Sequence, residues 1–357
     1  MSGIDPGASG DRQEREPPAK SRRRRIAGSV GGVAVVAVVF VVILPRIADY
    51  SEVWDVMTSL SSAELAALAV ITLINVATYG PPWMAALPGL GYRQSMVLTQ
   101  TSTALSVAVP GGDAVGIAAS YAMLRGWGFD RSAVAVAVVV TGVWNQIVNI
   151  VLPLLALSLL LLSGGSSPLL LTAGLIGIAA IAALAAALAL VLRGEPQARA
   201  TGERAERLAN RALRLVRRHP RAGWGEAVVR FRRETIDLLA RRWAPITAAA
   251  FAGHLTVFAV LMVSLRATGV DAGEVSWVEA LAAWGLIRLL TAVPVTPGGV
   301  GIVELGLSSA LVGFGADNAE AVAAVLLYRV LTVIPTLVLG GVLGLTWRRH
   351  RTVPSAE

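Results

Sequence analysis

Four ionisable side chains stand within or beside long apolar stretches of the sequence, and they are the residues best suited to chemistry. Arg288 interrupts one apolar stretch, and Arg329 occurs early in the last one. Glu304 and Asp113 each follow a Pro-Gly-Gly triplet. A charged side chain at the centre of a bilayer costs about 2.5–3.5 kcal/mol, so such residues are usually paired or line a water-filled path. The pattern predicts buried ion pairs or a site for an anionic group.

The partners of these charges are predicted from spacing. Arg288 and Glu304 flank the second triplet, so an ion pair across it is expected, either to shape the loop or to contact a substrate. Arg329 could bind a phosphate, cap the other hairpin, or extend toward the membrane surface near Glu320. Five further polar side chains within apolar stretches are interpreted as contacts that hold helices together: Asn75, Asn145, Gln146, Asn149 and His254.

The two Pro-Gly-Gly triplets have the composition of breaks within membrane helices. Proline removes a backbone donor, and glycine permits close approach and unusual dihedral angles. The helices after the breaks would present N–H groups and positive dipole ends, which suit a lipid phosphate, although simple packing kinks are the alternative. The predicted substrate-binding residues are Arg288, Pro297, Gly298, Gly299, Gly301, Glu304, Arg329, Pro110, Gly111, Gly112 and Asp113.

Composition predicts that the elements carrying these residues are membrane helices. Hydrophobic residues make up 55% of the 357-residue chain and charged residues 15%, with a mean hydropathy of +0.66. Soluble domains have about 25% charged residues. The net charge of +8 comes from arginines between apolar stretches, which indicates cytoplasmic loops rather than a nucleic-acid-binding face. With no cysteine and three histidines, we expect no disulfide, metal site or cofactor.

Six full spans and two shorter broken hairpins are predicted, because a span needs about 20 mainly apolar residues. The spans are expected at 26–44, 63–87, 133–162, 168–192, 245–265 and 321–345. The hairpins are expected at 95–124, between basic flanks, and at 280–312, between acidic flanks. Neither hairpin is expected to cross, so each should enter and leave on one side of the membrane.

Charge then predicts an all-α polytopic fold with an inverted repeat. The basic segments place both termini and the middle loop in the cytoplasm of a bacterial cell membrane. One hairpin would enter from inside and the other from outside, as in inverted-repeat transporters. The basic loop would lie on lipid headgroups or form a solvated helical hairpin. The predicted organisation is a disordered tail (1–25), a first membrane half (26–192), a cytoplasmic loop (193–243), a second half (244–347) and a C-terminal tail (348–357).

A family resemblance centres on the second break. The residues that carry it are Arg288, Val293-Pro294-Val295-Thr296-Pro297-Gly298-Gly299-Val300-Gly301, Glu304 and Arg329. They resemble the signature of the lysylphosphatidylglycerol synthase/flippase transmembrane-domain family, and the first break with Tyr121–Arg125 is similar to that family's first hairpin. The resemblance covers about residues 51–349. It implies flipping of a polar lipid, notably aminoacylated phosphatidylglycerol. The soluble aminoacyl-transfer domain is absent before Glu357, so no synthase activity is expected.

Three functions are carried forward as hypotheses. The first is a flippase-like protein that moves an anionic or aminoacylated phospholipid, or a lipid-linked intermediate, between leaflets. The second is a non-transporting scaffold or accessory subunit that binds a lipid-modifying enzyme through 193–243. The third, an intramembrane transferase, has no visible catalytic set, so we expect no enzymatic activity. Transport predicts a cavity lined by Arg288 and Glu304, and scaffolding predicts a dry hairpin interface.

Overall fold

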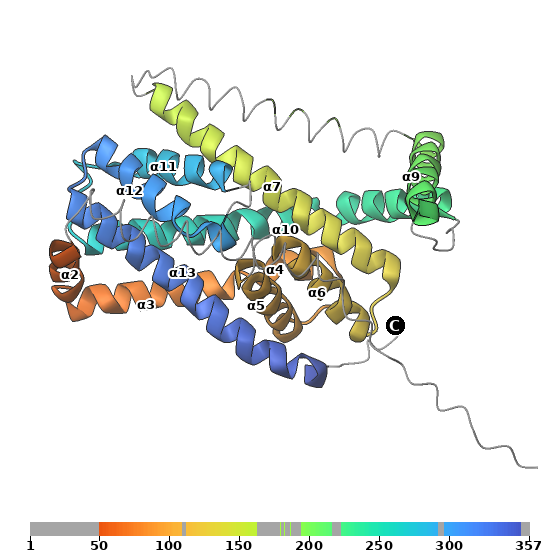
Figure 1. The fold of residues 1–357 in the computed structure, drawn as a ribbon, viewed down its shortest axis with the longest axis horizontal. Helices are drawn as coiled ribbons and strands as arrows, with labels where there is room; N and C mark the ends of the chain where they lie inside the picture. Colours follow the sequence, from red (N-terminus) through yellow and green to blue (C-terminus); the bar gives the residue numbers. More distant parts are fainter. Residues whose placement is uncertain are drawn as a thin grey trace, which may run out of the picture.

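The computed structural model describes residues 50–108, 112–162, 194–215, 223–291 and 296–350, with the single helical residues 179, 182 and 186. Within these residues the chain is helical and contains no strand. Most of the helices lie along the long axis of the molecule (Figure 1). They are α2 (Tyr50–Thr58), α3 (Ser62–Ala77), α4 (Pro81–Ala86), α5 (Tyr92–Ala108), α6 (Gly112–Gly126), α7 (Arg131–Leu162), α9 (Glu195–Leu215), α10 (Trp224–Ala267), α11 (Trp277–Leu290), α12 (Ile302–Phe314) and α13 (Asn318–Thr346), with short 3-10 turns η3 (Pro297–Gly299) and η4 (Trp347–His350).

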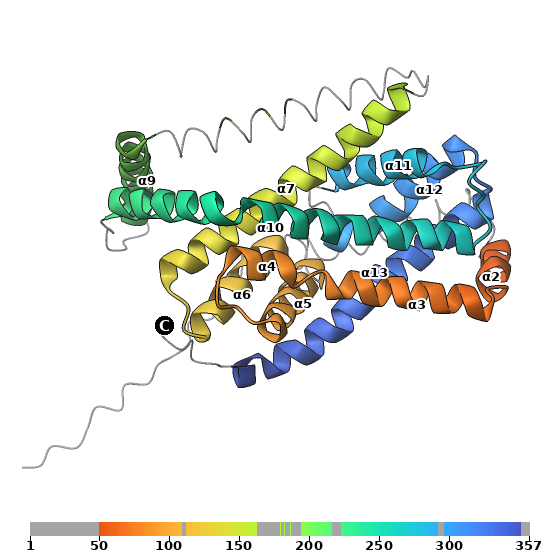
Figure 2. The same cartoon turned by 180° about the vertical axis from the view of Figure 1, so that it is seen from behind.

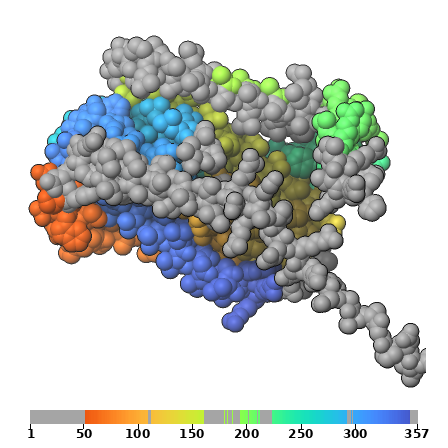
Figure 3. Space-filling view, in the orientation of Figure 1, coloured from red at the N-terminus to blue at the C-terminus, as the bar shows by residue number. Residues whose placement is uncertain are grey.

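The all-α membrane fold is confirmed. Among the described residues, four helical segments are long and apolar enough to cross a membrane: Ser62–Ala86, Arg131–Leu160, Trp224–Ala267 and Asn318–Arg349. They correspond to four of the six predicted spans. The spans predicted at 26–44 and 168–192 lie outside the described residues, apart from the three single helical positions, so the total number of spans stays a prediction. Figure 3 shows α13 running across the surface of one face.

The helix α10 runs through the boundary predicted at residues 243–244. It is continuous over 44 residues although Pro245 lies inside it, which gives a length of about 66 Å. Contacts on both sides of Pro245 support the continuous helix: Arg233 pairs with Glu195 of α9 before it, and Thr247 accepts the Trp144 indole N–H of α7 at 2.8 Å after it. The predicted basic loop is therefore a helical hairpin of α9 and the first half of α10, joined by an Arg233–Glu195 ion pair of 3.2 Å.

The two predicted hairpins are present as helix pairs, α5–α6 and α11–α12. The α5–α6 pair opens toward the end of the bundle where α9 lies, and the α11–α12 pair opens toward the opposite end, beside α2 (Figures 1 and 2). Hairpins that enter from opposite ends are the arrangement expected of an inverted repeat.

Both hairpins end in the same way. Gly128 and Gly315 have φ angles of 97° and 125° just after α6 and α12. Two residues later, Asp130 and Asp317 accept backbone N–H bonds from the first turns of α7 and α13. The bond from the Ser132 N–H holds the pKa of Asp130 below its usual value. The offset of 187 residues (315 minus 128) equals that between the Pro-Gly-Gly triplets (297 minus 110), so an internal repeat extends from each break to the next helix.

The apolar core has two main parts. The larger surrounds Trp284 and joins residues of α7, α10, α11, α12 and α13. The other joins α4, α5, α6 and α7 around Leu98 and Leu124. Each hairpin is therefore packed into its own cluster, and α7 and α10 contribute to both.

Candidate functional site

The first hairpin contacts the second break. The end of α5, next to the first break, contacts η3. A Cβ atom added at Gly298 would lie 2.8 Å from Cγ1 of Val107. That distance is shorter than real carbon contacts, so the Val107 side chain would have to shift if residue 298 carried a side chain. The fold thus brings the end of α5 to the second break, although Val107 and Gly298 are 191 residues apart in the sequence (298 minus 107).

The second break is built from left-handed glycines. Gly298, Gly299 and Gly301 have φ angles of 58°, 68° and 89°, which other residues adopt only at a cost of about 1–2 kcal/mol. Glu304 lies in the first turn of α12, and its Oε2 accepts the Gly301 N–H at 2.5 Å. The Glu304 carboxylate therefore occupies the Gly301 N–H, one of the groups after the break that were predicted to bind a lipid phosphate.

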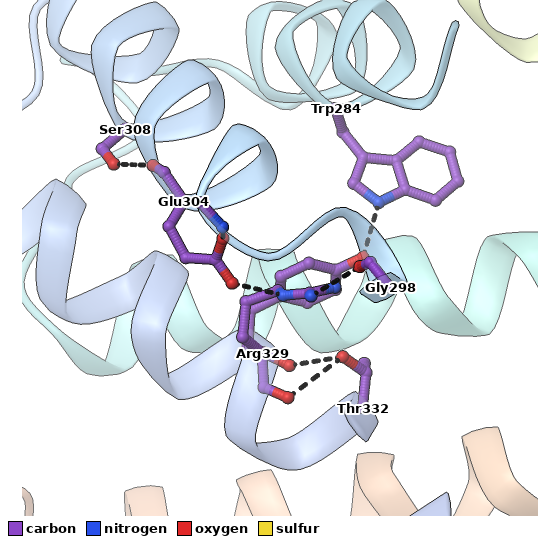
Figure 4. Close-up of polar contacts among 8 residues, drawn as sticks. Trp284, Gly298, Glu304, Ser308, Arg329 and Thr332 are labelled. Atoms are coloured by element: carbon purple, nitrogen blue, oxygen red, sulfur yellow. Dashed lines mark hydrogen bonds and ion pairs between the residues drawn. The ribbon is translucent and has the colours of Figure 1, made fainter. Parts of the chain in front are cut away.

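Glu304 pairs with Arg329, so the predicted Arg288–Glu304 pair is wrong. Arg329 Nε lies 2.7 Å from Glu304 Oε1, and its Nη2 donates to the Gly298 carbonyl at 2.8 Å (Figure 4). Ser308 also donates to the Glu304 carbonyl. The pair is almost fully enclosed, with Glu304 only 3% exposed. Arg329 points into the molecule rather than toward the membrane surface because α13 packs against α12.

Arg288 points instead toward α7. Its Nε donates to Asn149 Oδ1 at 3.0 Å, and its Cζ lies 4.7 Å from the ring centroid of Trp284. The Trp284 indole donates to the Tyr328 hydroxyl at 3.1 Å, which ties this assembly to α13. The Arg288 side chain makes no other hydrogen bond or ion pair with a described residue. Its two Nη groups are thus oriented but uncommitted within the described part of the chain.

Asn149 also contacts His254, which is buried on α10. His254 Nε2 lies 3.1 Å from Asn149 Oδ1, and Nδ1 lies 2.9 Å from the Ala250 carbonyl. Asn149 Nδ2 donates to Gln146 at 3.2 Å. The interpretation of these amides as helix-joining contacts is confirmed for Asn149, which links α7 to α10 and α11. Asn75 likewise donates to Thr256 on α10, whereas Asn145 is exposed.

The remaining predicted site residues are not all brought to this centre. Pro110 and Gly111 lie outside the described residues. Gly112 is buried, and an added Cβ would lie 2.2 Å from the Ser106 carbonyl oxygen of α5. Asp113 is exposed in the first turn of α6 and forms no ion pair with a described residue. Pro297 and Gly299 lie in η3, where a Cβ on Gly299 would approach Thr291 to 3.0 Å.

A groove of about 570 Å³ lies between α5, α6 and α13. Neither Arg288 nor Glu304 is among its lining residues, so this is not the cavity that transport was expected to show. Its wall is mostly small and apolar, including Ala104, Ala119, Ala122, Gly340, Gly341 and Gly344. The groove therefore presents hydrocarbon-like surface in helices that belong to the membrane part of the chain.

The contributions of Trp284 and Tyr328 were missed from the sequence. A signal for Trp284 was available, because it precedes Arg288 by four residues on one helix and side chains at that spacing share a face. Tyr328 immediately precedes Arg329 but gives no comparable local signal. Among the described residues, no group of three or more His, Asp or Glu side chains could hold a metal ion.

Comparison with known proteins agrees with the geometry. The family model described as the lysylphosphatidylglycerol synthase TM region matches residues 29–340. That range contains both hairpins and the residues Arg288, Glu304 and Arg329. No curated protein matches the chain. The chain therefore belongs to the family of the lysylphosphatidylglycerol synthase transmembrane region, as the resemblance at the second break implied.

Proposed function

We propose that this protein moves an anionic phospholipid between the two leaflets and that Arg288 holds its phosphate. The proposal depends on the contacts of the Arg288 guanidinium. Asn149 fixes one edge and Trp284 covers one face, while no described residue engages the Nη groups. A planar guanidinium with free Nη groups matches the oxygens of a phosphate.

The second arginine has a structural role in this proposal. Arg329 is neutralised by Glu304 and bonded to Gly298, so it stabilises the left-handed backbone of the break. Of the four ionisable residues near the two breaks, Glu304 and Arg329 neutralise each other, and Asp113 is exposed. Arg288 is then the remaining charge, and no described residue compensates it. A single positive charge suits a phosphodiester, which carries a single negative charge.

The groove between α5, α6 and α13 supports a lipid substrate. Its small, apolar wall would accept acyl chains, which gain about 0.8 kcal/mol per buried CH₂ when transferred from water but little when transferred from lipid. We therefore propose that the groove lets acyl chains remain in an apolar environment while the headgroup moves. Family membership supports a membrane lipid as the substrate class.

A scaffold function is the second proposal, and the α9–α10 hairpin favours it. Glu206 Oε2 accepts the Trp224 N–H at 3.0 Å, and Glu195 pairs with Arg233, so the hairpin is a defined surface. We propose that this surface faces the cytoplasm of a bacterial cell, as do both termini, because arginine-rich segments remain on that side. A lipid-modifying enzyme would be its partner.

Lipid exchange in liposomes tests the transport proposal. The purified full-length protein is reconstituted with fluorescent phosphatidylglycerol, and exchange between leaflets is followed by quenching of the outer leaflet. Arg288→Gln should lower the rate at least about tenfold, which corresponds to about 1.4 kcal/mol of lost interaction. Arg348→Gln is the matched control, because Arg348 also lies over a tryptophan, at 5.6 Å from the Trp347 ring, but in η4, just after α13.

The outcomes separate the two functions. Exchange that is lost with Arg288→Gln and kept with Arg348→Gln supports the proposed site. Absence of exchange with the folded wild-type protein across anionic and aminoacylated lipids would overturn transport. In that case, capture of a lipid-modifying enzyme by the full chain, lost when arginines of α9 are replaced, would support the scaffold.

A further inference from the structure

Both ring nitrogens of His254 lie within hydrogen-bond distance of oxygen atoms. The residue is 8% exposed and lies on α10 within the apolar core. Nδ1 is 2.9 Å from the Ala250 carbonyl oxygen, one turn earlier in the same helix. Nε2 is 3.1 Å from Asn149 Oδ1 on α7. A neutral imidazole has one donor and one acceptor nitrogen, so the partners decide which protonation state fits.

Arg288 fixes the orientation of the Asn149 amide. Arg288 Nε can only donate, and it lies 3.0 Å from Asn149 Oδ1. Turning the amide over would place an NH₂ group against that N–H, so the oxygen must face Arg288 and His254. The nitrogen of the amide correspondingly donates to Gln146 Oε1 at 3.2 Å.

Both nitrogens of His254 therefore face oxygens that can only accept. The Ala250 carbonyl requires a hydrogen on Nδ1, and Asn149 Oδ1 requires a hydrogen on Nε2. Only the doubly protonated imidazolium makes both hydrogen bonds. In the neutral ring, one nitrogen lone pair faces an oxygen lone pair, and one of the two contacts is lost.

The imidazolium stands beside a second cation. Arg288 is the charged group that acts on His254, since both contact the same Asn149 oxygen. Near His254, the described residues of the neighbouring elements offer no compensating negative charge. Near Arg288, Tyr79 follows the end of α3 and α13 contributes Tyr328. There α7 contributes amides, and Glu304 is committed to Arg329. Two close cations repel strongly where water is scarce, so a bound anion is needed to hold both.

We propose that His254 takes up a proton when an anionic headgroup binds at Arg288 and releases it when the headgroup leaves. This inference rests on the proposed function, because the headgroup is the anion. The proton comes from water and adds to the ring nitrogen that lacks one, and no covalent bond of the lipid changes. Headgroup binding and proton binding thus strengthen each other. A proton gradient is then a driving force that the site itself can use.

The coupling predicts a definite pH dependence of lipid affinity. Because the complex holds more protons than the empty protein, affinity falls as the pH rises through the titration of His254. The dissociation constant should increase by up to about tenfold per pH unit from the titration of His254 in the empty protein up to its titration in the complex, and become constant again at higher pH. Below the titration in the empty protein, His254 is already protonated and the affinity becomes independent of pH.

Calorimetry of the full chain in detergent tests the proposal. Short-chain phosphatidylglycerol is titrated at several pH values in buffers of different ionisation enthalpy, which reports the protons taken up per lipid. Wild type should take up as much as about one proton and bind more weakly as the pH rises. His254→Gln should bind with no uptake and no pH dependence. His350→Gln replaces another of the three histidines and should behave as wild type.

Asn149→Asp provides a second test if His254→Gln does not fold. A carboxylate at residue 149 would lie between the two cations and keep His254 protonated in the empty protein. Proton uptake should then fall close to zero, and lipid affinity should decrease because one positive charge is compensated. Retention of full uptake by this variant would contradict the assignment.

The failures of the two proposals are distinguishable. Wild-type lipid binding without proton uptake overturns the coupling and leaves lipid binding at Arg288 standing. Uptake that persists in His254→Gln assigns the proton to another group and also overturns the coupling. Absence of lipid binding by folded wild type overturns the proposed function, and with it the inference.

Discussion

The two hairpins share a Pro-Gly-Gly triplet but use the glycines in and just after it for different purposes. In the α5–α6 hairpin, Gly112 and Gly116 lie against backbone carbonyls of α5, where a Cβ would be as close as 2.2 Å and 2.7 Å. In the α11–α12 hairpin, Gly298, Gly299 and Gly301 supply positive φ angles instead. The first hairpin therefore needs glycine for space, and the second needs it for backbone conformation.

The hairpins also differ in charge. The second encloses the Glu304–Arg329 pair and has Arg288 in the last turn of α11, nine residues before its triplet (297 minus 288). In the described part of the first hairpin, Asp113 and Arg125 are the charged residues of α6, and Asp113 is exposed. The comparison teaches that a repeated sequence motif can be held by close packing in one copy and by a buried ion pair in the other.

The largest effect should come from breaking the buried pair. Arg329→Leu leaves Glu304 charged and enclosed, so the free energy of unfolding should fall by about 3–5 kcal/mol. Denaturant or thermal unfolding in detergent measures the change. Arg233→Leu breaks the exposed pair with Glu195, whose side chains are 64% and 51% exposed, and serves as the control. Its cost should stay below about 1 kcal/mol. Equal costs would contradict the role assigned to the buried pair.

The packing of the first hairpin should be the next most sensitive. Gly112→Ala places a Cβ against the Ser106 carbonyl, and overpacking of this kind costs about 1–3 kcal/mol. Gly142→Ala is the matched change, since its Cβ would meet nothing within 4 Å among the described residues of the exposed face of α7. Alanine should stabilise that helix by up to about 1 kcal/mol. The same unfolding assay applies, and loss of stability in both variants would mean that the approach at Gly112 is not decisive.

Backbone conformation in the second hairpin is tested at Gly298. Gly298→Ala forces an L-residue to φ 58°, at about 1–2 kcal/mol, and adds the contact with Val107. Gly223→Ala isolates the backbone term, because Gly223 has φ 90° and an added Cβ would meet no described atom within 4 Å. Gly298→Ala should therefore cost more than Gly223→Ala in thermal unfolding. The reverse order would show that the two hairpins do not touch as tightly as the distance implies.

The smallest change in stability is expected in the groove beside the first hairpin. A Cβ at Gly341 would contact no described atom within 4 Å, so Gly341→Leu should alter stability by less than about 0.5 kcal/mol. It should nevertheless slow lipid exchange severalfold by filling the groove. Gly313→Leu on α12 has equal space and lies outside the groove lining, so it should leave exchange unchanged. Unchanged exchange in Gly341→Leu would remove the groove from the transport proposal.

The sequence predicted features that have local causes. Proline, glycine and arginine positions located both breaks and the hairpins, and apolar length located four spans that the described residues contain. The partner of Glu304 could not be predicted, because Arg288 and Arg329 are both near in sequence and only the packing of α13 on α12 selects Arg329. The continuity of α10 was missed for a similar reason, since Pro245 is a local break signal that tertiary contacts overrode.

The chain from the break to the turn after the second helix has the same length in both hairpins. From Gly112 to Gly128 and from Gly299 to Gly315 the chain has the same number of residues. One inserted residue would lengthen a helix by about 1.5 Å and rotate everything beyond it by about 100°. The tip would then miss its counterpart, and Val107 would no longer face Gly298. The length of each hairpin thus determines whether α5 and the second break meet. An inserted residue in either hairpin should be tolerated less well than most changes of side chain.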